Sequence, residues 1–309
     1  MRILLATDGS DSARFALDFL VDFPFPAKSE AVVLSVIDWN AFKIEKELSD
    51  EHNRTIRKAQ EFIQDETEQL LTSEGERLRS ADWAGSVEIR HGDPADEIIR
   101  AAQDLEVDLV VLGSHGTSGI KRFLLGSVSR RVLEYASCSV LIVKQPSAGK
   151  TETGSTEMVS GEHETRPRRR ILLAYDNSEP SRKALSLCSS LPLDDRAEVT
   201  AVSVMPLVTA YRQDIRQHMN TIWQQKKHAA SVALEEAMQA LRWSTPHVSA
   251  VMREGANVSE EILDLAEQSG TDLIVVGCKG KSAIQRFLLG SITNRIAGHA
   301  HCSVWAVRI

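Results

Sequence analysis

Gly113-Ser114-His115-Gly116, nine residues, and then Gly126-Ser127 form a stretch that returns 164 positions later as Gly277-Cys278-Lys279-Gly280, nine residues, and Gly290-Ser291. Aligned without gaps, segments 113–143 and 277–307 share 16 of 31 residues. A repeat with so long a period suits two copies of one domain better than a solenoid. A chain of 309 residues can form two domains that each bury a core. We therefore expect domains at 1–145 and 169–309, joined by 146–168.

The composition excludes several classes of protein. It is typical of a soluble globular chain, with 42% hydrophobic and 26% charged residues. The sequence contains no run of about 18 uncharged apolar residues, so no membrane span is expected. The apolar run at the N-terminus is too short for a signal peptide. The net charge of −7 argues against general nucleic-acid binding. We interpret the cysteines as small buried residues in a reducing cytoplasm rather than as disulfide or metal sites: Cys138, Cys188, Cys278 and Cys302.

Both halves follow one pattern of strands and helices. Each opens with an apolar strand that ends in an acid, at 3–8 and 171–176, and a helix start follows. Ser10 or Asp11 is the expected cap in the first half, and Ser178 with Pro180 in the second. The other expected strands are 31–37, 86–90, 108–112, 139–143, 198–205, 248–253, 272–276 and 303–307. The other expected helices are 53–73 and 213–241, and those that begin near 94, 258, 127 and 291.

This order of elements predicts an α/β fold. The strands are apolar along their whole length, as strands covered on both faces of a parallel sheet must be. We expect two doubly wound domains, each a parallel sheet with helices on both faces. Segment 145–170 lacks periodicity and is rich in Gly, Ser, Thr, Glu and Lys, so it is predicted to be a flexible linker. We interpret its basic end, 166–170, as a solvated approach to the next strand, with a tether to an anionic partner as the alternative.

The repeated glycines are placed where a phosphate could bind. They follow the fourth strand, at the carboxyl edge where such sheets bind ligands, and Gly113 and Gly116 allow close approach. Gly126-Ser127 begins a helix whose N–H groups and dipole attract anions, and Ser129 is a further candidate donor. The second half repeats the pattern with Gly277, Gly280, Gly290, Ser291 and Thr293. The alternative is that the glycines only permit tight turns, and the duplicated spacing favours an anion site. No P-loop sequence is present.

With these residues the chain resembles a tandem-domain universal stress protein of the ATP-binding type. The resemblance covers both halves, and its most specific element is the glycine spacing followed by Ala-x-Cys-Ser-Val at 136–140 and 300–304. It implies a five-stranded parallel sheet in the order 3-2-1-4-5 in each domain. It also implies a contact between fifth strands, which a tandem chain can form internally or in a homodimer.

The resemblance also implies the residues of two ATP sites. In the ATP-binding branch of the family this motif holds the phosphates and ribose, the acid after the first strand lies near the nucleotide, and the end of the second strand meets adenine through its backbone. In the first domain these are Thr7, Asp8, Val36, Ile37, Gly113, Ser114, His115, Gly116, Arg122, Gly126, Ser127, Val128 and Ser129. In the second they are Tyr175, Asp176, Val204, Met205, Gly277, Cys278, Lys279, Gly280, Arg286, Gly290, Ser291, Ile292 and Thr293.

Two questions stay open at the sequence level. The acids Asp8 and Asp176 either contact ribose or adenine, or act indirectly through a magnesium ion on the phosphates, or simply help to cap a helix. The second loop is the more basic, since Lys279 replaces His115. If these side chains reach the phosphates, the second site should bind a triphosphate more tightly; the alternative is that they point to solvent.

We expect an ATP-binding regulatory protein of the stress response, located in the cytoplasm, with one nucleotide site per domain. It would act through nucleotide-dependent conformation or through an unidentified protein partner. No catalytic residues are predicted, because the chain lacks a Walker lysine, a kinase residue set and an evident base for an attacking water. The alternatives are a slow ATPase and an interaction module that no longer uses nucleotide. AMP and cyclic nucleotides are further candidate ligands.

Overall fold

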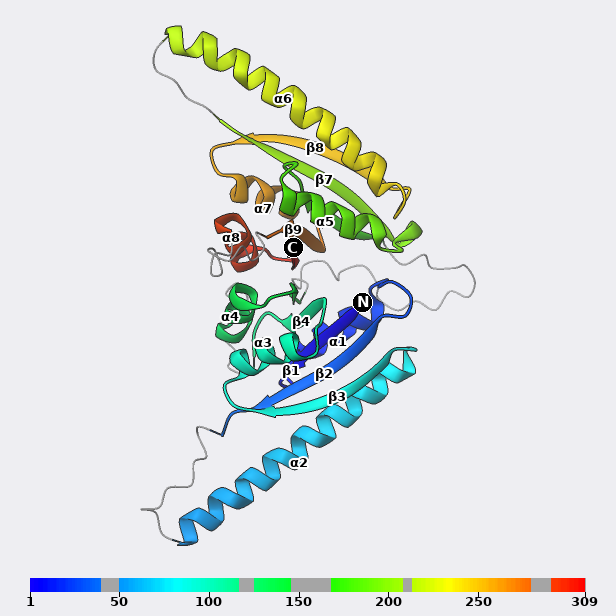
Figure 1. The fold of residues 1–309 in the computed structure, drawn as a ribbon, viewed down its shortest axis with the longest axis vertical. Coiled ribbons are helices and arrows are strands. Elements are labelled where there is room, and N and C mark those ends of the chain that lie inside the picture. The colour runs from blue at the N-terminus through cyan, green and yellow to red at the C-terminus, as the bar shows by residue number, and fades with distance from the viewer. Residues whose placement is uncertain (40–49, 117–124, 146–167, 208–212, 279–289, 309) are drawn as a thin grey trace, which may run out of the picture. The chain divides into compact units, whose positions relative to one another are not determined.

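The structure divides into two compact units, which are described separately (Figure 1). The computed structural model describes residues 1–39, 50–116, 125–145, 168–207, 213–278 and 290–308. The predicted linker therefore lies almost wholly outside the described residues, and its extent stays a prediction. Pairing through the fifth strands, within the chain or in a homodimer, also stays a prediction.

The first unit contains a parallel sheet in the predicted order. Hydrogen-bonded neighbours give the order β3-β2-β1-β4-β5. The strands are β1 (Arg2–Thr7), β2 (Glu30–Ile37), β3 (Ala84–His91), β4 (Leu109–Gly113) and β5 (Ser139–Val143). The last pair of the β1–β2 ladder is Thr7↔Ser35, so β2 continues beyond the end of β1. The predicted fold class is confirmed for this unit.

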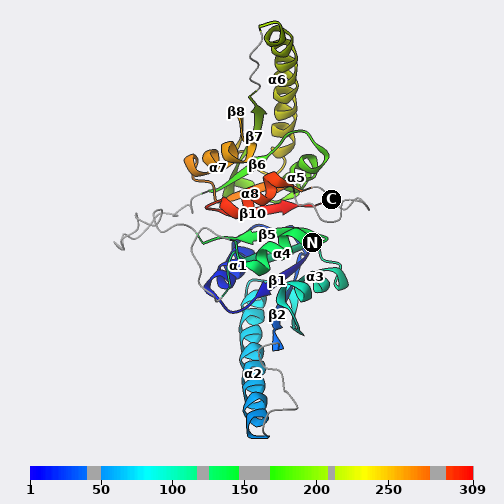
Figure 2. The same ribbon diagram turned by 90° about the vertical axis from the view of Figure 1, so that its left-hand side faces the viewer.

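Helices cover both faces of that sheet, as Figure 2 shows for α1 and α3 on opposite sides of β1. The helices are α1 (Asp11–Asp22), α2 (Asp50–Ser80), α3 (Pro94–Asp104) and α4 (Ser127–Tyr135). Helices α3 and α4 contact each other, and α2 packs on β2 and β3. The start of α3 and the start of α4 thus reach the same carboxyl edge of the sheet.

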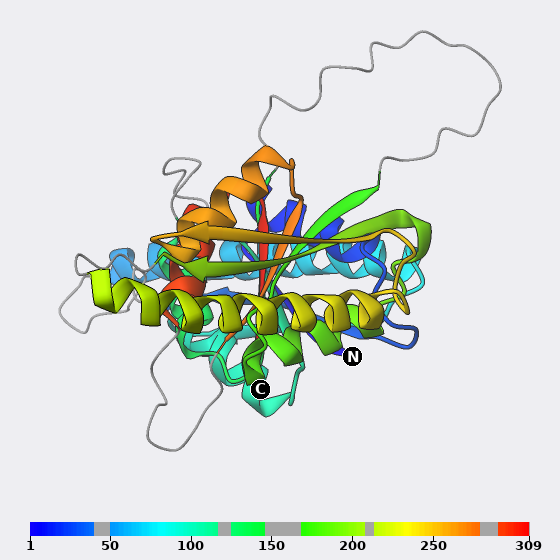
Figure 3. The ribbon, with the colours of Figure 1, turned by 90° about the horizontal axis from the view of Figure 1, so that it is seen from above.

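The second unit repeats this architecture. Its sheet has the order β8-β7-β6-β9-β10. The strands are β6 (Arg169–Ala174), β7 (Ala197–Pro206), β8 (Val248–Gly255), β9 (Leu273–Gly277) and β10 (Ser303–Val307). The helices are α5 (Glu179–Ser190), α6 (Gln213–Leu241), α7 (Val258–Gln268), α8 (Ser291–His299) and a 3-10 turn, η2 (Asp194–Arg196), which was not predicted. Helix α6 runs beside β7 and β8 (Figure 3).

Helix boundaries follow the capping residues of the sequence. Ser10 Oγ accepts the Ala13 N–H at 3.2 Å, so Ser10 rather than Asp11 is the cap of α1. Ser178 caps α5 in the same way. The prediction that the long helix ends at residue 73 was wrong, because α2 continues through Gly75. A Cβ atom at Gly75 would lie 3.0 Å from Val87 Cγ1, so the glycine lets the helix approach β3.

Two predictions, on the cysteines and on the basic run, can be compared with the structure. All four cysteines are free thiols, and three are buried, whereas Cys138 is only half-buried. Burial raises the pKa of the Cys188 thiol to about 12. In the basic run, Arg168 donates to the Asp195 carbonyl, and Arg170 donates to a carbonyl and pairs with a carboxylate of its own unit. These contacts favour the interpretation of the basic run as the approach to the next strand over the alternative, a tether to an anionic partner.

Within the described ranges, no helix combines the length and the apolar character that crossing a bilayer requires.

The first glycine of each motif is required by packing. A Cβ atom at Gly113 would lie 2.6 Å from the backbone C and O atoms of Ser12, in the first turn of α1. At Gly277 it would lie 2.3 Å from the same atoms of Pro180, in α5. Real Cβ atoms do not approach backbone this closely, so only glycine lets the fourth strand of each unit end against that helix.

Gly113→Ala should therefore destabilise the first unit by about 1–3 kcal/mol, the usual cost of overpacking. Gly298→Ala is the matched control, because a Cβ atom there has no neighbour within 4 Å in the described part of the chain. That change should stabilise α8 by about 0.5–1 kcal/mol. Denaturant unfolding of the full chain measures both, and equal stability of Gly113→Ala and the wild type would contradict the packing argument.

Candidate functional site

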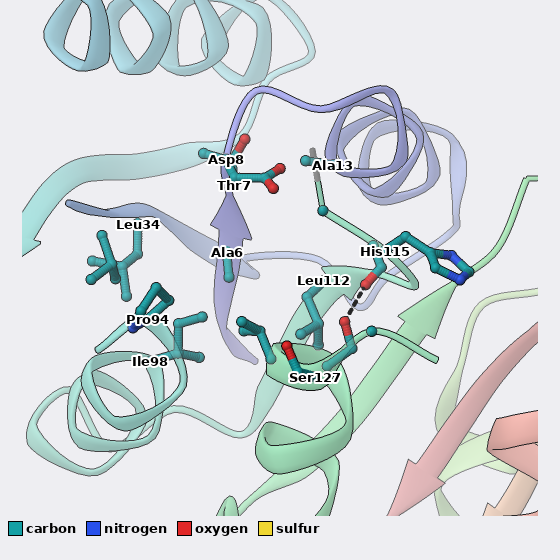
Figure 4. A pocket seen from close by; sticks show the side chains of 16 residues that line it. Ala6, Thr7, Asp8, Ala13, Leu34, Pro94, Ile98, Leu112, His115 and Ser127 are labelled. Carbon is teal, nitrogen blue, oxygen red and sulfur yellow. Dashed lines mark hydrogen bonds between the residues drawn. The ribbon is translucent and has the colours of Figure 1, made fainter. Parts of the chain in front are cut away.

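A cavity of about 250 Å³ opens at the carboxyl edge of the first unit's sheet (Figure 4). Its walls come from the ends of β1, β2 and β4, the residues that follow β4, and the starts of α1, α3 and α4. Most of the residues predicted for the first site line it: Thr7, Asp8, Val36, Gly113, His115, Gly116, Gly126, Ser127, Val128 and Ser129. The structure therefore brings together residues that lie up to 122 positions apart, from residue 7 to residue 129.

Two of the predicted residues that the structure describes, Ile37 and Ser114, do not line this cavity. The Ile37 carbonyl accepts the Gly92 N–H at 3.0 Å and so is used by the turn after β3. Ser114 is buried, and its N–H donates to the Val143 carbonyl. Arg122 lies outside the described residues.

One wall of the cavity is apolar, and sequence reasoning missed it. The labelled side chains of Figure 4 include Ala6, Leu34, Pro94, Ile98 and Leu112, which face the cavity from β1, β2, α3 and β4. The signal was available, because the repeat places apolar residues at the corresponding positions of the second half: Ala174, Val202, Val258, Ile262 and Val276. A flat apolar ligand would fit against such a wall.

The end of β2 presents backbone groups to the same cavity. Because the backbone groups of successive residues in a strand point to opposite neighbours, Val36 faces β1, whereas Ile37 faces β3. The Val36 carbonyl lies beyond the last pair of the β1–β2 ladder. In the second unit the Val202 carbonyl accepts the Tyr175 N–H at 2.8 Å on the β6 side, and Val204, two residues on, faces that side too.

The opposite end of the cavity is the N-terminus of α4. Its cap residue, Gly126, makes no side-chain hydrogen bond, in contrast to the serine cap of α1. The first-turn N–H groups of α4 therefore have no capping side chain, and they carry the positive end of the helix dipole. Gly290 begins α8 in the same way. Each unit thus offers an anion the N-terminus of a helix at its carboxyl edge.

The hydroxyl groups of Ser129 and Thr293 are hydrogen-bonded within their own units. Ser129 Oγ donates to the Gly113 carbonyl at 2.7 Å, and Thr293 Oγ1 donates to the Gly277 carbonyl at 3.4 Å. Both side chains are buried. They tie the first helical turn to the end of the preceding strand, because that carbonyl has no ladder partner past the strand end. Ser127 remains the hydroxyl candidate for an anion.

The acid after the first strand shapes the turn that follows it. Asp8 Oδ1 accepts the Ser10 N–H at 3.1 Å, and Asp176 Oδ1 accepts the Ser178 N–H at 3.0 Å. Helix α1 is capped by Ser10, so Asp8 is not the cap, and it also lines the cavity. A Cβ atom at Gly116 would lie 2.7 Å from Asp8 Oδ2, so this glycine makes room for the carboxylate.

Asp176 is held in its charged form. Burial by itself would raise the pKa of this carboxyl, but hydrogen bonds from Ser178 and Ser181 outweigh burial and lower it below its usual value. The side chain is therefore an ionised acceptor at neutral pH, suited to the hydroxyl groups of a sugar.

His115 packs at the margin of the first cavity. Its backbone N–H donates to Ser12 Oγ at 3.3 Å, and its Nδ1 lies 3.0 Å from Ser114 Oγ. Figure 4 shows the ring directed away from Leu34 and Pro94, the apolar end of the cavity. Its counterpart Lys279 is outside the described residues, as are Gly280 and Arg286, so the predicted difference in charge between the two sites stays a prediction.

The described part of the second site has the same plan. The predicted residues at the corresponding positions are Tyr175, Asp176, Val204, Met205, Gly277, Cys278, Gly290, Ser291, Ile292 and Thr293. Met205 is buried, and the Cys278 N–H donates to the Val307 carbonyl at 2.7 Å, as Ser114 does to Val143. Among the described residues, no group of three or more His, Cys, Asp or Glu side chains is placed to hold a metal ion.

An ion-pair cluster joins the two helices that begin at the first cavity. Asp93 caps α3 by accepting the Asp96 N–H at 3.0 Å. Arg131, from α4, donates to both carboxylate oxygens of Asp93, at 3.0 and 3.1 Å, and also pairs with Asp96. Asn257 caps α7 in the second unit without a charge. Sequence reasoning missed Asp93 and Arg131, because their pairing depends on how α3 and α4 pack.

Comparison with known proteins agrees with this architecture. The family model for the universal stress protein family matches residues 1–144 and 167–308. Universal stress protein MJ0531 of Methanocaldococcus jannaschii is 31% identical over 147 residues, which cover 47% of this chain and 82% of that protein. A universal stress protein of Mycolicibacterium smegmatis is 28% identical over 222 residues, 72% of this chain and 68% of that one. A solved universal stress protein from Archaeoglobus fulgidus has a TM-score of 0.60 at 23% identity and covers 99% of this chain and 98% of its own.

The fold and the site define a tandem α/β protein with a cavity at the carboxyl edge of the first unit's parallel sheet. The chain belongs to the universal stress protein family, because the family model matches nearly all of both repeats.

Asp93→Ala should destabilise the first unit by about 1 kcal/mol through the lost cap, whereas Asp93→Asn should cost less because asparagine also caps helices. The Asp96 N–H and Arg131 hold the pKa of Asp93 below its usual value. This contribution to stability is therefore present above the usual aspartate pKa and is lost as pH falls through the lowered one. Unfolding measured from neutral to acid pH should show the loss in the wild type and not in Asp93→Asn; equal acid profiles would contradict it.

Proposed function

We propose that each unit binds one adenine nucleotide, ATP in the first instance, and that binding changes the conformation or the protein partner of the chain in the stress response. One observation carries this proposal: an uncapped helix N-terminus and an apolar wall lie at opposite ends of one cavity. A nucleotide has this same division into an anionic end and a flat apolar end. Regulation requires that nucleotide favour one state of the protein over another.

The apolar wall and the end of β2 suit adenine. A purine would lie between Leu34, Pro94 and Ile98, and the Val36 carbonyl would accept a hydrogen bond from the exocyclic amino group. Guanine has a carbonyl oxygen at that ring position, and two facing acceptors repel each other. Adenine is therefore the expected base, read by the backbone rather than by a side chain. Val204 would act in the same way in the second unit.

The first turn of α4 suits the phosphates. The N–H groups of Ser127 and Val128 and the Ser127 hydroxyl would bind the oxygen atoms, and Asp8 would accept hydrogen bonds from the ribose. A magnesium ion bound to the phosphates would reduce their charge, and it would lie near Asp8 without needing a direct protein ligand. The first turn of α4 indicates a phosphate site more firmly than it indicates the number of phosphates. AMP and cyclic nucleotides are therefore tested beside ATP.

We propose that the chain works by binding and not by turnover, in the cytoplasm. The sequence lacks the Walker lysine and the kinase residue set that dedicated ATP-hydrolysing and phosphate-transferring enzymes use. Slow ATP hydrolysis would appear as multiple-turnover phosphate release that is lost in Asp8→Ala with Asp176→Ala. A module that does not use nucleotide would retain no ATP during purification, whereas native mass spectrometry should find bound ATP on the purified chain.

Ser127→Asp and Ser291→Asp test the proposal without damaging the fold. An acid in the first turn of a helix favours the helix by about 0.3–1 kcal/mol, but it repels a phosphate at the same place. Each single change should lower the ATP stoichiometry from two to one, and the double change should abolish binding, by isothermal titration calorimetry. Unfolding should show that stability is unchanged or higher.

Ser80→Asp is the matched control for charge. Ser80 is exposed at the end of α2, near the start of β3 and so at the other edge of the sheet. It should bind two ATP molecules with wild-type affinity. Undiminished ATP binding by the double variant, or no binding by the wild type, would overturn the proposal.

A further inference from the structure

Glu74 is a buried acid behind the cavity of the first unit. It lies on α2 and is 5% exposed, and its Oε1 accepts a hydrogen bond of 2.9 Å from Thr7 Oγ1. Its Oε2 is buried and has no hydrogen-bond partner among the residues that the structure describes. A carboxylate in this position would lack the hydrogen bonds that a buried charge needs, so the site favours the uncharged acid.

The buried acid is linked to the cavity through Thr7. Thr7 lines the cavity, and its Oγ1 also accepts the Gly9 N–H at 3.3 Å. Gly9 is the left-handed residue, with φ +72°, of the turn that holds Asp8. The position of Asp8 at the cavity thus depends on a chain of contacts from Glu74 through Thr7 to Gly9.

The second unit has replaced both members of this pair. Tyr175 stands in the place of Thr7, and its hydroxyl donates to Asn177 Oδ1 at 3.1 Å. Ala237 stands in the place of Glu74, since it falls between buried Leu234 and Leu241 as Glu74 falls between Leu71 and Leu78. The second unit therefore has no carboxylic acid at the position of Glu74.

The charged groups around Glu74 decide whether its ionisation favours or opposes nucleotide binding at the first site. The charged groups that face it are Asp8, Arg14 from α1 and Arg77 from α2 itself. Burial is the largest influence and raises the pKa of Glu74; the Thr7 hydrogen bond and the two arginines oppose it only in part. Ionisation would place a second negative charge behind the wall that faces a nucleotide.

We propose that Glu74 is a positioning residue that makes the first site, and not the second, respond to pH: its uncharged form supports nucleotide binding, and its ionised form opposes it. This inference rests on the proposed function, because it concerns the affinity of that site. The ionised carboxylate would repel the phosphates and would disturb the Thr7–Gly9 turn that positions Asp8.

The direction of the pH dependence follows from the thermodynamic linkage between proton binding, folding and nucleotide binding. An acid whose pKa is raised by folding adds stability that is fully present below its ordinary pKa, and this stability is lost as pH rises through the raised value. Bound phosphates add negative charge, so they raise the pKa of Glu74 further. By reciprocity, nucleotide affinity at the first site must fall as pH rises across the same range.

The test compares chains in which only one site binds. In Ser291→Asp the first site remains, and its Kd for ATP should rise about three- to tenfold more, as pH is raised from the ordinary glutamate pKa to above neutrality, than in Ser291→Asp with Glu74→Gln. Titration of ATP itself is common to both chains and cancels. Glu76→Gln, at an exposed position of the same helix, is the control and should leave the slope unchanged. In Ser127→Asp only the second site remains, and Glu74→Gln should have no effect.

Two further measurements distinguish a failure of this inference from a failure of the proposed function. Without nucleotide, Glu74→Gln should remove the loss of stability of the first unit as pH rises, which a fold change unrelated to ionisation would not do. Tyr175→Thr with Ala237→Glu should transfer the pH dependence to the second site. Equal pH slopes with and without Glu74→Gln, in chains that bind ATP, would overturn the inference and leave the proposed function intact. Absence of ATP binding by Ser291→Asp at every pH would instead overturn the proposed function.

Discussion

The close approach of the fourth strand to the first helix sets the geometry of each site. Gly113 ends β4 against the backbone of Ser12, and Gly277 ends β9 against Pro180 in the same manner. Because the strand and the helix meet so closely, the residues that follow β4 turn back across the end of β1. Gly116 then lies against the Asp8 carboxylate. The cavity lies between the residues that follow β4, the end of the sheet and the first turn of α4.

The glycine motif therefore has two roles at different positions. Its first glycine is needed for packing, so a bulky change at Gly113 tests folding rather than ligand binding. Gly116 makes room for an acid, and Gly126 begins a helix without a capping side chain. Binding is better tested at Ser127, where a negative charge suits the helix and opposes a phosphate. The same division of roles holds for Gly277, Gly290 and Ser291.

The fold was predictable because each of its sequence patterns is local and occurs in both halves of the chain. Apolar strands, serine caps and the helix start after Gly126 all lie at their predicted places, and the strand order followed from the family resemblance. The site was predictable in part. The sequence marks Asp8 and Ser127, but the apolar wall of Leu34, Pro94 and Ile98 comes from two elements, β2 and α3, that only the folded chain brings together. The orientation of the Ser129 hydroxyl and the burial of Glu74 depend on packing between elements, which periodicity does not contain.

The central claim is that the first turns of α4 and α8 bind the phosphates of an adenine nucleotide. Backbone amide NMR of the full chain during titration with ATP tests it most directly. The account predicts large saturable shifts for the amides of Ser127, Val128, Ser291 and Ile292, with smaller shifts at Val36 and Val204. The amides of Ser80 and Gly298 should stay unchanged. Saturable ATP binding that leaves the four helix-start amides unshifted, or no shift anywhere in the chain, would contradict it.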